Sequence, residues 1–452
     1  MGNIIPVRNE TRGRMNLDIA EFKLRRQKLM AVMGNGVAII PTANEVIRNR
    51  DSHYPYRFDS YFYYLTGFQE PESVLVLVAA SISGPAQSIL FCRDKDMERE
   101  IWDGFRFGAD AARESFGFDA AYSIHELDEV LLKLLGNQPK LFFSLGESLT
   151  WDNRVTGWIN NLRAQSRTGV SAPDEIVDVR KLLDELRLYK SPFEQALMRK
   201  SAVIAAAAHN RAMRFTQPNM MEYEVEAEFL HDFYRKGAQS PAYTSIVAGG
   251  ANACTLHYNA NNQKLNAGDL LLIDAGCEFD GYASDITRTF PVNGKFSGAQ
   301  KEVYELVLAA QAAAIAKVNI GSHWNEPHEA ALNVLIQGFI DLKLCTGTRD
   351  AVLESGTYRQ FYMHRTGHWL GLDVHDAGDY KDKRNDWRKL ELGMALTVEP
   401  GCYIRPADNV PEVFWNIGIR IEDDVLVTAN GCEVITAAAV KTVADIEALM
   451  QS

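Results

Sequence analysis

The sequence predicts an α/β domain followed by an α+β domain, and three observations support this. The chain has 452 residues, more than one hydrophobic core usually organises. Its first part alternates short apolar segments with helical ones, whereas its second part places long helices and apolar strands in separate blocks. The boundary is expected near Tyr189, which gives an N-terminal domain of residues 1–188 and a C-terminal domain of residues 189–452.

In the first domain, strands are expected at 36–40, 73–78, 88–91 and 140–143. These runs are short, rich in Val, Ile, Leu and Phe, and bounded by Gly, Pro or Ser, as buried strands are. Residues 128–135 are expected to form a helix. The domain carries neither a phosphate loop nor a dinucleotide-binding fingerprint, so we expect an α/β domain without a nucleotide-binding motif.

In the second domain, capping boxes predict where the long helices begin. Ser191 and Glu194 can hydrogen-bond each other's backbone amides, with Pro between them, which predicts a helix over 192–214. A second helix is expected over 221–237, ending at a glycine. Another capping box at 297–300 opens a third helix. Apolar runs between these helices predict strands, so the domain is expected to be α+β.

Composition and charge limit the possible partners and location. The net charge of −12 argues against a nucleic-acid partner, which requires a basic surface. No apolar run is long enough to span a bilayer, and the N-terminus lacks the apolar segment of a secretory signal. The six cysteines are scattered without a CxxC pair, which favours reduced thiols. We therefore expect a cytoplasmic protein without a membrane or nucleic-acid partner.

Acidic residues follow apolar runs, where an unpaired charge would be costly. Residues 270–273 are apolar and lead directly into Asp274, and Asp285 follows beyond a glycine-containing turn. This spacing predicts a hairpin that brings the two aspartates together. A second apolar hairpin is expected to carry Glu399 and Glu422 in the same way.

Two interpretations of these four carboxylates are open. Each could pair with a nearby arginine, Arg288 or Arg420. However, four converging anions need more positive charge than two arginines bring, and divalent cations can supply it. Carboxylates that bridge two such ions serve hydrolytic chemistry.

Histidines cluster between the two hairpins in sequence. His364, His368 and His375 fall within fourteen residues, 363–376, although the chain has only 10 histidines. His257 lies shortly before the first hairpin. A group of this kind favours a metal ligand combined with acid–base or hydrogen-bonding groups.

These motifs, in this order, resemble those of the pita-bread metallopeptidases, and within them the aminopeptidase P family. The segments that carry the resemblance are 272–276, 285–290, 364–375, 397–401 and 418–422, together with 51–57 and 65–72 near the N-terminus. The resemblance covers nearly the whole chain and implies a creatinase-like N-terminal domain and a pita-bread catalytic domain. Residues 1–15 have no counterpart in the family, and we expect them to form a disordered tail.

The resemblance implies a site for two metal ions per chain, expected to be Mn²⁺, with other divalent metals possible. It implies that Asp285 and Glu422 bridge the ions, that Asp274 completes the coordination of one, and that His368 and Glu399 complete that of the other. An oxygen-rich set of this kind agrees with the preference of hard cations.

The remaining roles also follow from the resemblance. Glu399 matches the proton shuttle, and His257 and His375 match the histidines that hold the substrate and stabilise developing negative charge. His364 matches a further histidine of the pocket. Arg420 and Tyr403 match groups that orient the metal carboxylates and contact the substrate.

The activity implied is removal of the first residue from peptides with proline in second position, by a hydroxide held between the metals. The family also implies a homotetramer, in which the N-terminal domain serves oligomerisation and pocket closure, and Trp102 reaches a neighbouring subunit's substrate pocket. One alternative is prolidase, which cuts only dipeptides; segment 94–102 resembles aminopeptidase P and argues against it. A second is a non-catalytic pita-bread binding protein, which would have lost metal ligands.

The sequence departs from the family pattern beside the metal histidine, and also at residues 391–393, which we interpret as a turn variant. Arg365, Thr366 and Gly367 stand where many relatives have small apolar residues before the metal histidine. We expect this difference to alter the rim of the pocket and to leave ligation unchanged.

Overall fold

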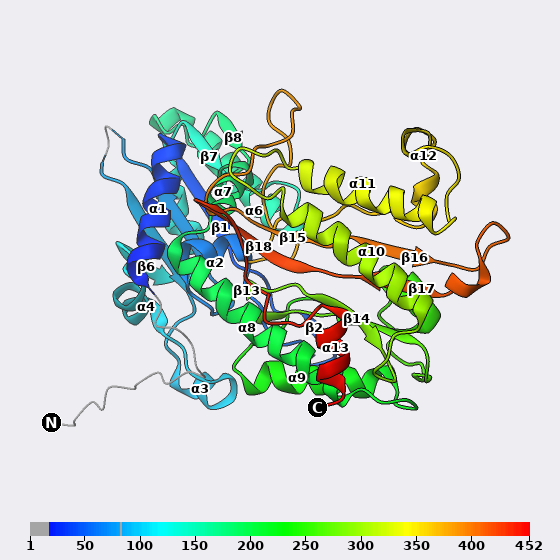
Figure 1. Cartoon of the computed structure of the whole chain (residues 1–452). Coiled ribbons are helices and arrows are strands. Elements are labelled where there is room, and N and C mark those ends of the chain that lie inside the picture. Colours follow the sequence, from blue (N-terminus) through cyan, green and yellow to red (C-terminus); the bar gives the residue numbers. More distant parts are fainter. Residues whose placement is uncertain (1–17, 82–83) are drawn as a thin grey trace. The chain divides into compact units, whose positions relative to one another are not determined.

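The computed structural model describes residues 18–81 and 84–452, which form two compact units (Figure 1). The chain divides between Arg187 and Leu188. The tail expected at residues 1–15 lies outside the described residues. None of the described helices is long and apolar enough to cross a membrane.

The first unit is built on a mixed six-stranded sheet. Its strands, in spatial order, are β6 (Ala120–Ser123), β5 (Gln87–Cys92), β4 (Val74–Val78), β1 (Val37–Pro41), β7 (Lys140–Phe142) and β8 (Glu175–Val177). Strand β1 pairs antiparallel with β4 and parallel with β7. A separate hairpin consists of β2 (Ile47–Asn49) and β3 (Ser52–His53).

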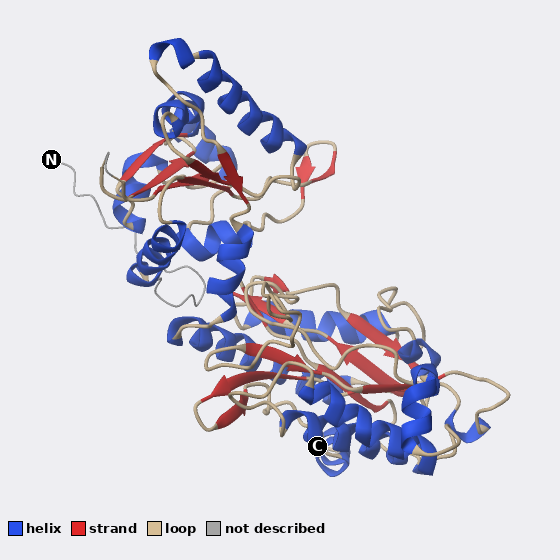
Figure 2. Ribbon diagram, turned by 90° about the horizontal axis from the view of Figure 1, so that it is seen from above, coloured by secondary structure: helices blue, strands red, loops and turns tan. Residues whose placement is uncertain are grey.

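Helices lie on both sides of this sheet (Figure 2). They are α1 (Ile19–Met33), α2 (Ser60–Thr66), α3 (Met97–Asp103), α4 (Gly108–Phe116), α5 (Leu127–Leu135), α6 (Leu149–Ala164) and α7 (Arg180–Leu188). Because side chains alternate along a strand, Val37 and Ile39 point to the same face, where they join the buried cluster that includes Leu131 of α5 and Trp158 of α6. The predicted α/β architecture of this domain is confirmed.

Two antiparallel β ribbons form the centre of the second unit. The first contains β11 (Leu270–Asp274), β12 (Cys277–Phe279), β13 (Tyr282–Ala283) and β14 (Thr287–Pro291), with β9 (Ser240–Pro241) and β10 (Ile246–Gly249) beside it. The second contains β15 (Ala395–Val398), β16 (Gly401–Ile404), β17 (Ile417–Arg420), β18 (Asp423–Thr428) and β19 (Gly431–Val434).

The helices of this unit pack against the ribbons. They are α8 (Pro192–Phe215), α9 (Glu222–Arg235), α10 (Gly298–Ile315), α11 (Glu326–Asp341), α12 (Arg349–Ser355) and α13 (Val443–Met450). Helices α10 and α11 lie side by side (Figure 1), and α10 also contacts the second ribbon. The capping boxes that open α8 and α10 are present as predicted. Helix α9 ends two residues earlier than expected, at Arg235, and Gly237 lies in the turn that follows.

Each ribbon is interrupted, and this refines the simple hairpins expected from the sequence. In the first ribbon, β11 pairs with β14 up to Asp274, and the shorter pair β12–β13 continues beyond a gap that contains Asp285. In the second, β15–β18 and β16–β17 are separated by a gap that contains Glu399 and Glu422. Backbone groups in these gaps lack a ladder partner and must find another.

In each gap, one backbone amide donates to a residue of the other ribbon. The amide of Glu422 donates to the Thr287 carbonyl at 3.1 Å, and the amide of Asp285 donates to Asp424 Oδ2 at 3.0 Å. We call this place, where the gaps of the two ribbons meet, the joint. It brings residues that are more than a hundred positions apart in sequence into contact.

Candidate active site

The two aspartates of the first ribbon share a hydrogen-bond donor at the joint. Asp274 is the last residue of β11, and Asp285 lies between β13 and β14. The Tyr243 hydroxyl contacts Asp274 Oδ1 at 2.6 Å and also contacts Asp285 Oδ1. The structure therefore brings the two aspartates together, as the sequence predicted.

The two glutamates of the second ribbon face the same place. Glu399 follows β15, and its amide donates to the Thr366 carbonyl at 2.8 Å. Glu422 accepts a hydrogen bond of 2.7 Å from the Thr287 hydroxyl, which belongs to the first ribbon. The joint thus fixes carboxylates from both ribbons.

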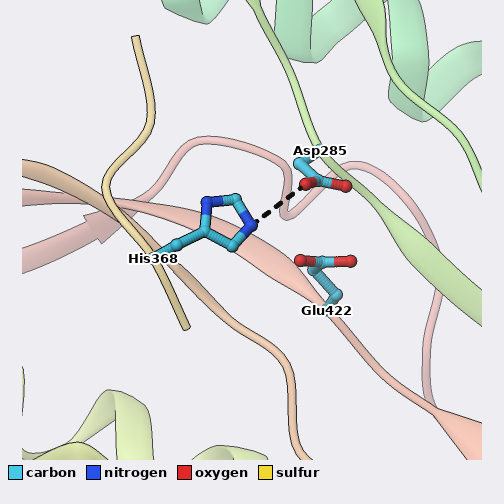
Figure 3. Close-up of side chains that lie close together, drawn as sticks. All are labelled: Asp285, His368 and Glu422. Carbon is cyan, nitrogen blue, oxygen red and sulfur yellow. Dashed lines mark ion pairs between the residues drawn. The ribbon is translucent and has the colours of Figure 1, made fainter. Parts of the chain in front are cut away.

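His368 completes this cluster (Figure 3). Ligand atoms of Asp285, His368 and Glu422 all lie within 4.8 Å of one another. His368 Nε2 lies 3.4 Å from Asp285 Oδ2 and 3.7 Å from Glu399 Oε1. Its Nδ1 lies 2.9 Å from the Trp369 carbonyl, which can only accept, so Nδ1 carries the proton and Nε2 presents its lone pair to the carboxylates.

Burial, together with crowding of negative charge, raises the pKa values of three carboxyl groups in this cluster. Burial, reinforced by Asp274, raises the pKa of Asp285 well above its usual value. Burial and Asp285 do the same to the pKa of Glu422. Burial and Glu422 raise the pKa of Glu399 to about 8.

The nearby arginines neutralise only part of this charge. Arg288 pairs with Asp423 at 2.7 Å, outside the cluster, and Arg420 pairs with Asp274 at 2.6 Å. Among the residues that the structure describes, no lysine or arginine forms an ion pair with the other three carboxylates, Asp285, Glu399 and Glu422. Arginine pairing, the first of the two interpretations, therefore does not account for the cluster.

The donor atoms fit divalent cations. A histidine lone pair and several carboxylate oxygens face one another, and too few guanidinium groups lie between them to neutralise the ionised carboxylates. Such an arrangement repels itself unless positive charge lies at its centre. Four carboxylates and one imidazole form a donor set suited to hard or borderline ions such as manganese.

A directed chain of hydrogen bonds leads from the cluster to the rim of the pocket. Arg420 Nη1 donates to the Tyr403 hydroxyl at 2.9 Å, and that hydroxyl donates to His364 Nε2 at 2.8 Å. His364 Nδ1 in turn donates to the Arg365 carbonyl at 2.7 Å. Burial and the nearby Arg420 lower the pKa of His364 to about 4, so the ring is neutral and can accept from Tyr403.

A cavity of about 440 Å³ opens above the cluster. Its floor includes the buried side chains of Asp285, Arg420 and Glu422, and its exposed lining includes His257 and His375. The rings of His375 and His368 meet edge to face, with centroids 4.3 Å apart. A cavity of this size is typical of small-ligand and substrate pockets.

Two residues that fix the site escaped the sequence analysis. Tyr243 stands alone in a loop, and no spacing rule identifies it. Glu222, the first residue of α9, is fully buried and accepts hydrogen bonds from both ends of the segment that carries His257.

Trp102, which the sequence analysis assigned to a neighbouring subunit's pocket, lies in α3 of the first unit and is 82% exposed.

The fold and the site together define a class of protein. Two interrupted ribbons that gather four carboxylates and a histidine are the arrangement of a pita-bread metallohydrolase. Residues 196–429 match metallopeptidase family M24, and residues 22–142 match the N-terminal domain of aminopeptidase P. The chain belongs to metallopeptidase family M24, in its aminopeptidase P group, and has the pita-bread fold.

Relatives with this domain pair match along nearly the whole chain. The Xaa-Pro aminopeptidases of Escherichia coli (strain K12) and Haemophilus influenzae are 45% and 47% identical, each over 95% of this chain and 97% of the relative. Among solved structures, Pseudomonas aeruginosa aminopeptidase PepP has a TM-score of 0.94 at 49% identity, covering 97% of this chain and 98% of that one. A zinc-substituted Escherichia coli aminopeptidase P in complex with product also has a TM-score of 0.94, at 44% identity, covering 97% and 99%.

Proposed function

We propose that this protein is an Xaa-Pro aminopeptidase, which hydrolyses the bond between the first residue of a peptide and a proline in second position. The observation that carries the proposal is the cluster at the joint, in a chain that matches Xaa-Pro aminopeptidases over 95% of its length. Hydrolysis of a peptide bond requires an activated water and stabilisation of the carbonyl oxygen, and both can be assigned to residues of the cavity.

We assign the binding of two divalent cations to Asp274, Asp285, His368, Glu399 and Glu422. When bound, the two cations polarise the scissile carbonyl and lower the pKa of the attacking water. Manganese is our preferred metal because four of the five side chains are carboxylates. Arg420 and Tyr243 orient the aspartates through the hydrogen bonds described above.

The proton transfers are assigned to Glu399. Its carboxylate lines the cavity and lies 3.7 Å from His368 Nε2, so it stands beside the place where the attacking water would be held. His257 and His375 line the cavity with exposed rings and can donate to the carbonyl oxygen as negative charge develops. His364 lines the cavity, and the fully buried Tyr403 holds its ring from behind through their hydrogen bond.

Two further parts of the proposal concern assembly and location. Ile101 and Trp102 are more than 80% exposed on a short charged helix, which is costly for a lone subunit. A homotetramer in which Trp102 enters a neighbour's pocket would cover it. For the location we propose the cytoplasm, because the six cysteines are unpaired and thiols stay reduced there.

The activity is tested with the purified chain and added manganese. Xaa-Pro dipeptides and longer Xaa-Pro peptides are compared, with a peptide that has alanine in second position as the control. Release of the first residue from the longer proline peptides is expected. Cleavage of dipeptides alone would identify a prolidase instead, and cleavage of nothing would favour a binding protein.

Metal content is measured on the same preparation. We expect two ions per chain after loading and dialysis. Full activity with fewer than one ion per chain would exclude the two-metal assignment.

A further inference from the structure

Among the residues that the structure describes, one charged side chain, that of Arg365, lies at the rim of the substrate cavity. The other exposed lining residues are uncharged polar groups and histidines, such as Thr244 and Asn259. The acidic residues of the lining, together with Arg420, lie deeper, where they are buried or half-buried. Charge in the cavity is therefore separated, with the carboxylates at the floor and one guanidinium at the mouth.

The guanidinium of Arg365 is held in place without being neutralised. Its Nη2 donates to Asn325 Oδ1, and the group lies 5.1 Å from the centroid of the Trp387 ring. Within residues 18–81 and 84–452, Arg365 makes no ion pair with a carboxylate. A guanidinium has five N–H donors, so most of them can serve a ligand.

A second cation and an aromatic ring lie beside Arg365, while the Glu329 carboxylate is held by Asn325 Nδ2 at 2.6 Å. Lys381 Nζ lies 4.7 Å from the same Trp387 ring, which adds a second positive charge to this side of the mouth. A planar guanidinium supported by an aromatic ring is well suited to bind a carboxylate with two parallel hydrogen bonds.

The direction of the substrate follows from the charge separation. On the proposed function, the first residue and the proline occupy the cavity, and the substrate's free amine is a cation. The acidic floor attracts that amine, so the peptide must leave the cavity past the rim. The residue after the proline then passes the guanidinium at the mouth.

We propose that Arg365 is a specificity-determining residue that favours substrates with a carboxylate immediately after the proline. The carboxylate can be the side chain of an acidic third residue or the free C-terminus of a tripeptide, since both present the same group. This inference rests on the proposed function and adds a substrate class to it.

The test compares three tripeptides that differ only in charge beyond the proline. They are Ala-Pro-Glu amide, Ala-Pro-Gln amide and Ala-Pro-Gln with a free carboxylate. Comparison of the Glu amide with the Gln amide isolates the effect of the side-chain carboxylate. Comparison of the free Gln peptide with the Gln amide isolates the effect of the terminal carboxylate. For the wild type, kcat/KM is expected to be about fivefold higher for at least one charged peptide than for the neutral one, the magnitude of an exposed ion pair.

The variants show whether Arg365 causes this preference. In Arg365→Gln the ratio should fall towards one, and Arg365→Lys should retain part of it. Arg384→Gln is the matched control, because Arg384 is 83% exposed and does not line the cavity; its ratio should equal that of the wild type. High salt should reduce the wild-type ratio, since mobile ions screen an exposed pair.

The outcomes separate this inference from the activity itself. If none of the peptides is cleaved, the proposed function fails. If all are cleaved with ratios near one, or if Arg365→Gln keeps the wild-type ratio, the aminopeptidase stands and the role of Arg365 is wrong. A merely structural role would change all three rates together and leave the ratios unaltered.

Discussion

Glu222 offers a sharp test of how the segment that carries His257 is held. Its Oε1 accepts from the amide of Gly249 at 2.8 Å and from Asn252 Nδ2 at 3.0 Å. Its Oε2 accepts from the Tyr258 hydroxyl at 2.7 Å and from the amide of Gln263 at 2.9 Å. These four donors span the segment that contains His257, so one buried carboxylate fixes the loop.

The perturbation is Glu222→Gln, which keeps the size of the side chain but leaves one acceptor oxygen. That oxygen can satisfy one pair of donors, and the new NH₂ group faces the other pair. The Tyr258 hydroxyl can rotate to accept, but the amide of Gln263 then faces another donor. A donor left without a partner costs about 1–3 kcal/mol, and loss of the charge weakens the bonds that remain. We expect the free energy of local opening of the loop to fall by about 2 kcal/mol, which increases the open population roughly thirtyfold.

The assay is hydrogen exchange followed by mass spectrometry on peptides that cover 249–263. Exchange there should accelerate, and kcat should fall because His257 is no longer held. Glu224→Gln is the control: Glu224 is exposed and, within the described part of the chain, accepts only from the amide of Met221, a role that glutamine fulfils equally well. If Glu222→Gln exchanges as slowly as the wild type and Glu224→Gln, the carboxylate does not hold the loop.

The other predictions concern catalysis, acid stability and the neighbouring subunit. Glu399→Gln should fold normally but lose about a hundred- to ten-thousand-fold in kcat, because an amide cannot shuttle a proton; a large residual rate would exclude this role. His257→Ala and His375→Ala should keep both cations in metal analysis yet lose rate, and a metal-free His375 variant would place that residue among the ligands. Burial lowers the pKa of His209 from 6.5 to about 4, so between these pH values the unfolded chain binds a proton that the folded chain does not. The contribution of neutral His209 to stability is therefore fully present above pH 6.5 and is lost on acidification. Between pH 7 and pH 4, the free energy of unfolding measured by urea titration should fall by about 3 kcal/mol more in the wild type than in His209→Gln, and equal decreases would contradict this. Trp102→Ala should raise KM for longer peptides while sedimentation still shows an oligomer, and a fully active monomer would rule out a shared site.

Local signals in the sequence were sufficient to predict several of the elements. The Ser191–Glu194 capping box and the apolar run that ends at Asp274 each act within a few residues, so the start of α8 and the strand β11 could be predicted. The gathering of the carboxylates was also predictable, because both hairpins place acidic side chains at the ends of buried strands. The roles of the individual residues remain predictions.

Long-range contacts could not be read from the chain. The interruptions of the ribbons are stabilised by contacts between them, such as the Glu422 amide on the Thr287 carbonyl, and no local pattern records these. Tyr243 and Glu222 act on residues 27 to 42 positions away, through hydrogen bonds that only the folded chain brings together.

The joint implies that neither half of the catalytic domain could hold the cations alone. A fragment ending before β15 would keep Asp274 and Asp285 but lack both glutamates, and the amide of Asp285 would lose its partner Asp424. A complementary fragment would keep the glutamates and lose the hydroxyl of Thr287 that orients Glu422. Separately expressed halves should therefore bind manganese only after they associate, so that metal uptake would report reassembly of the domain.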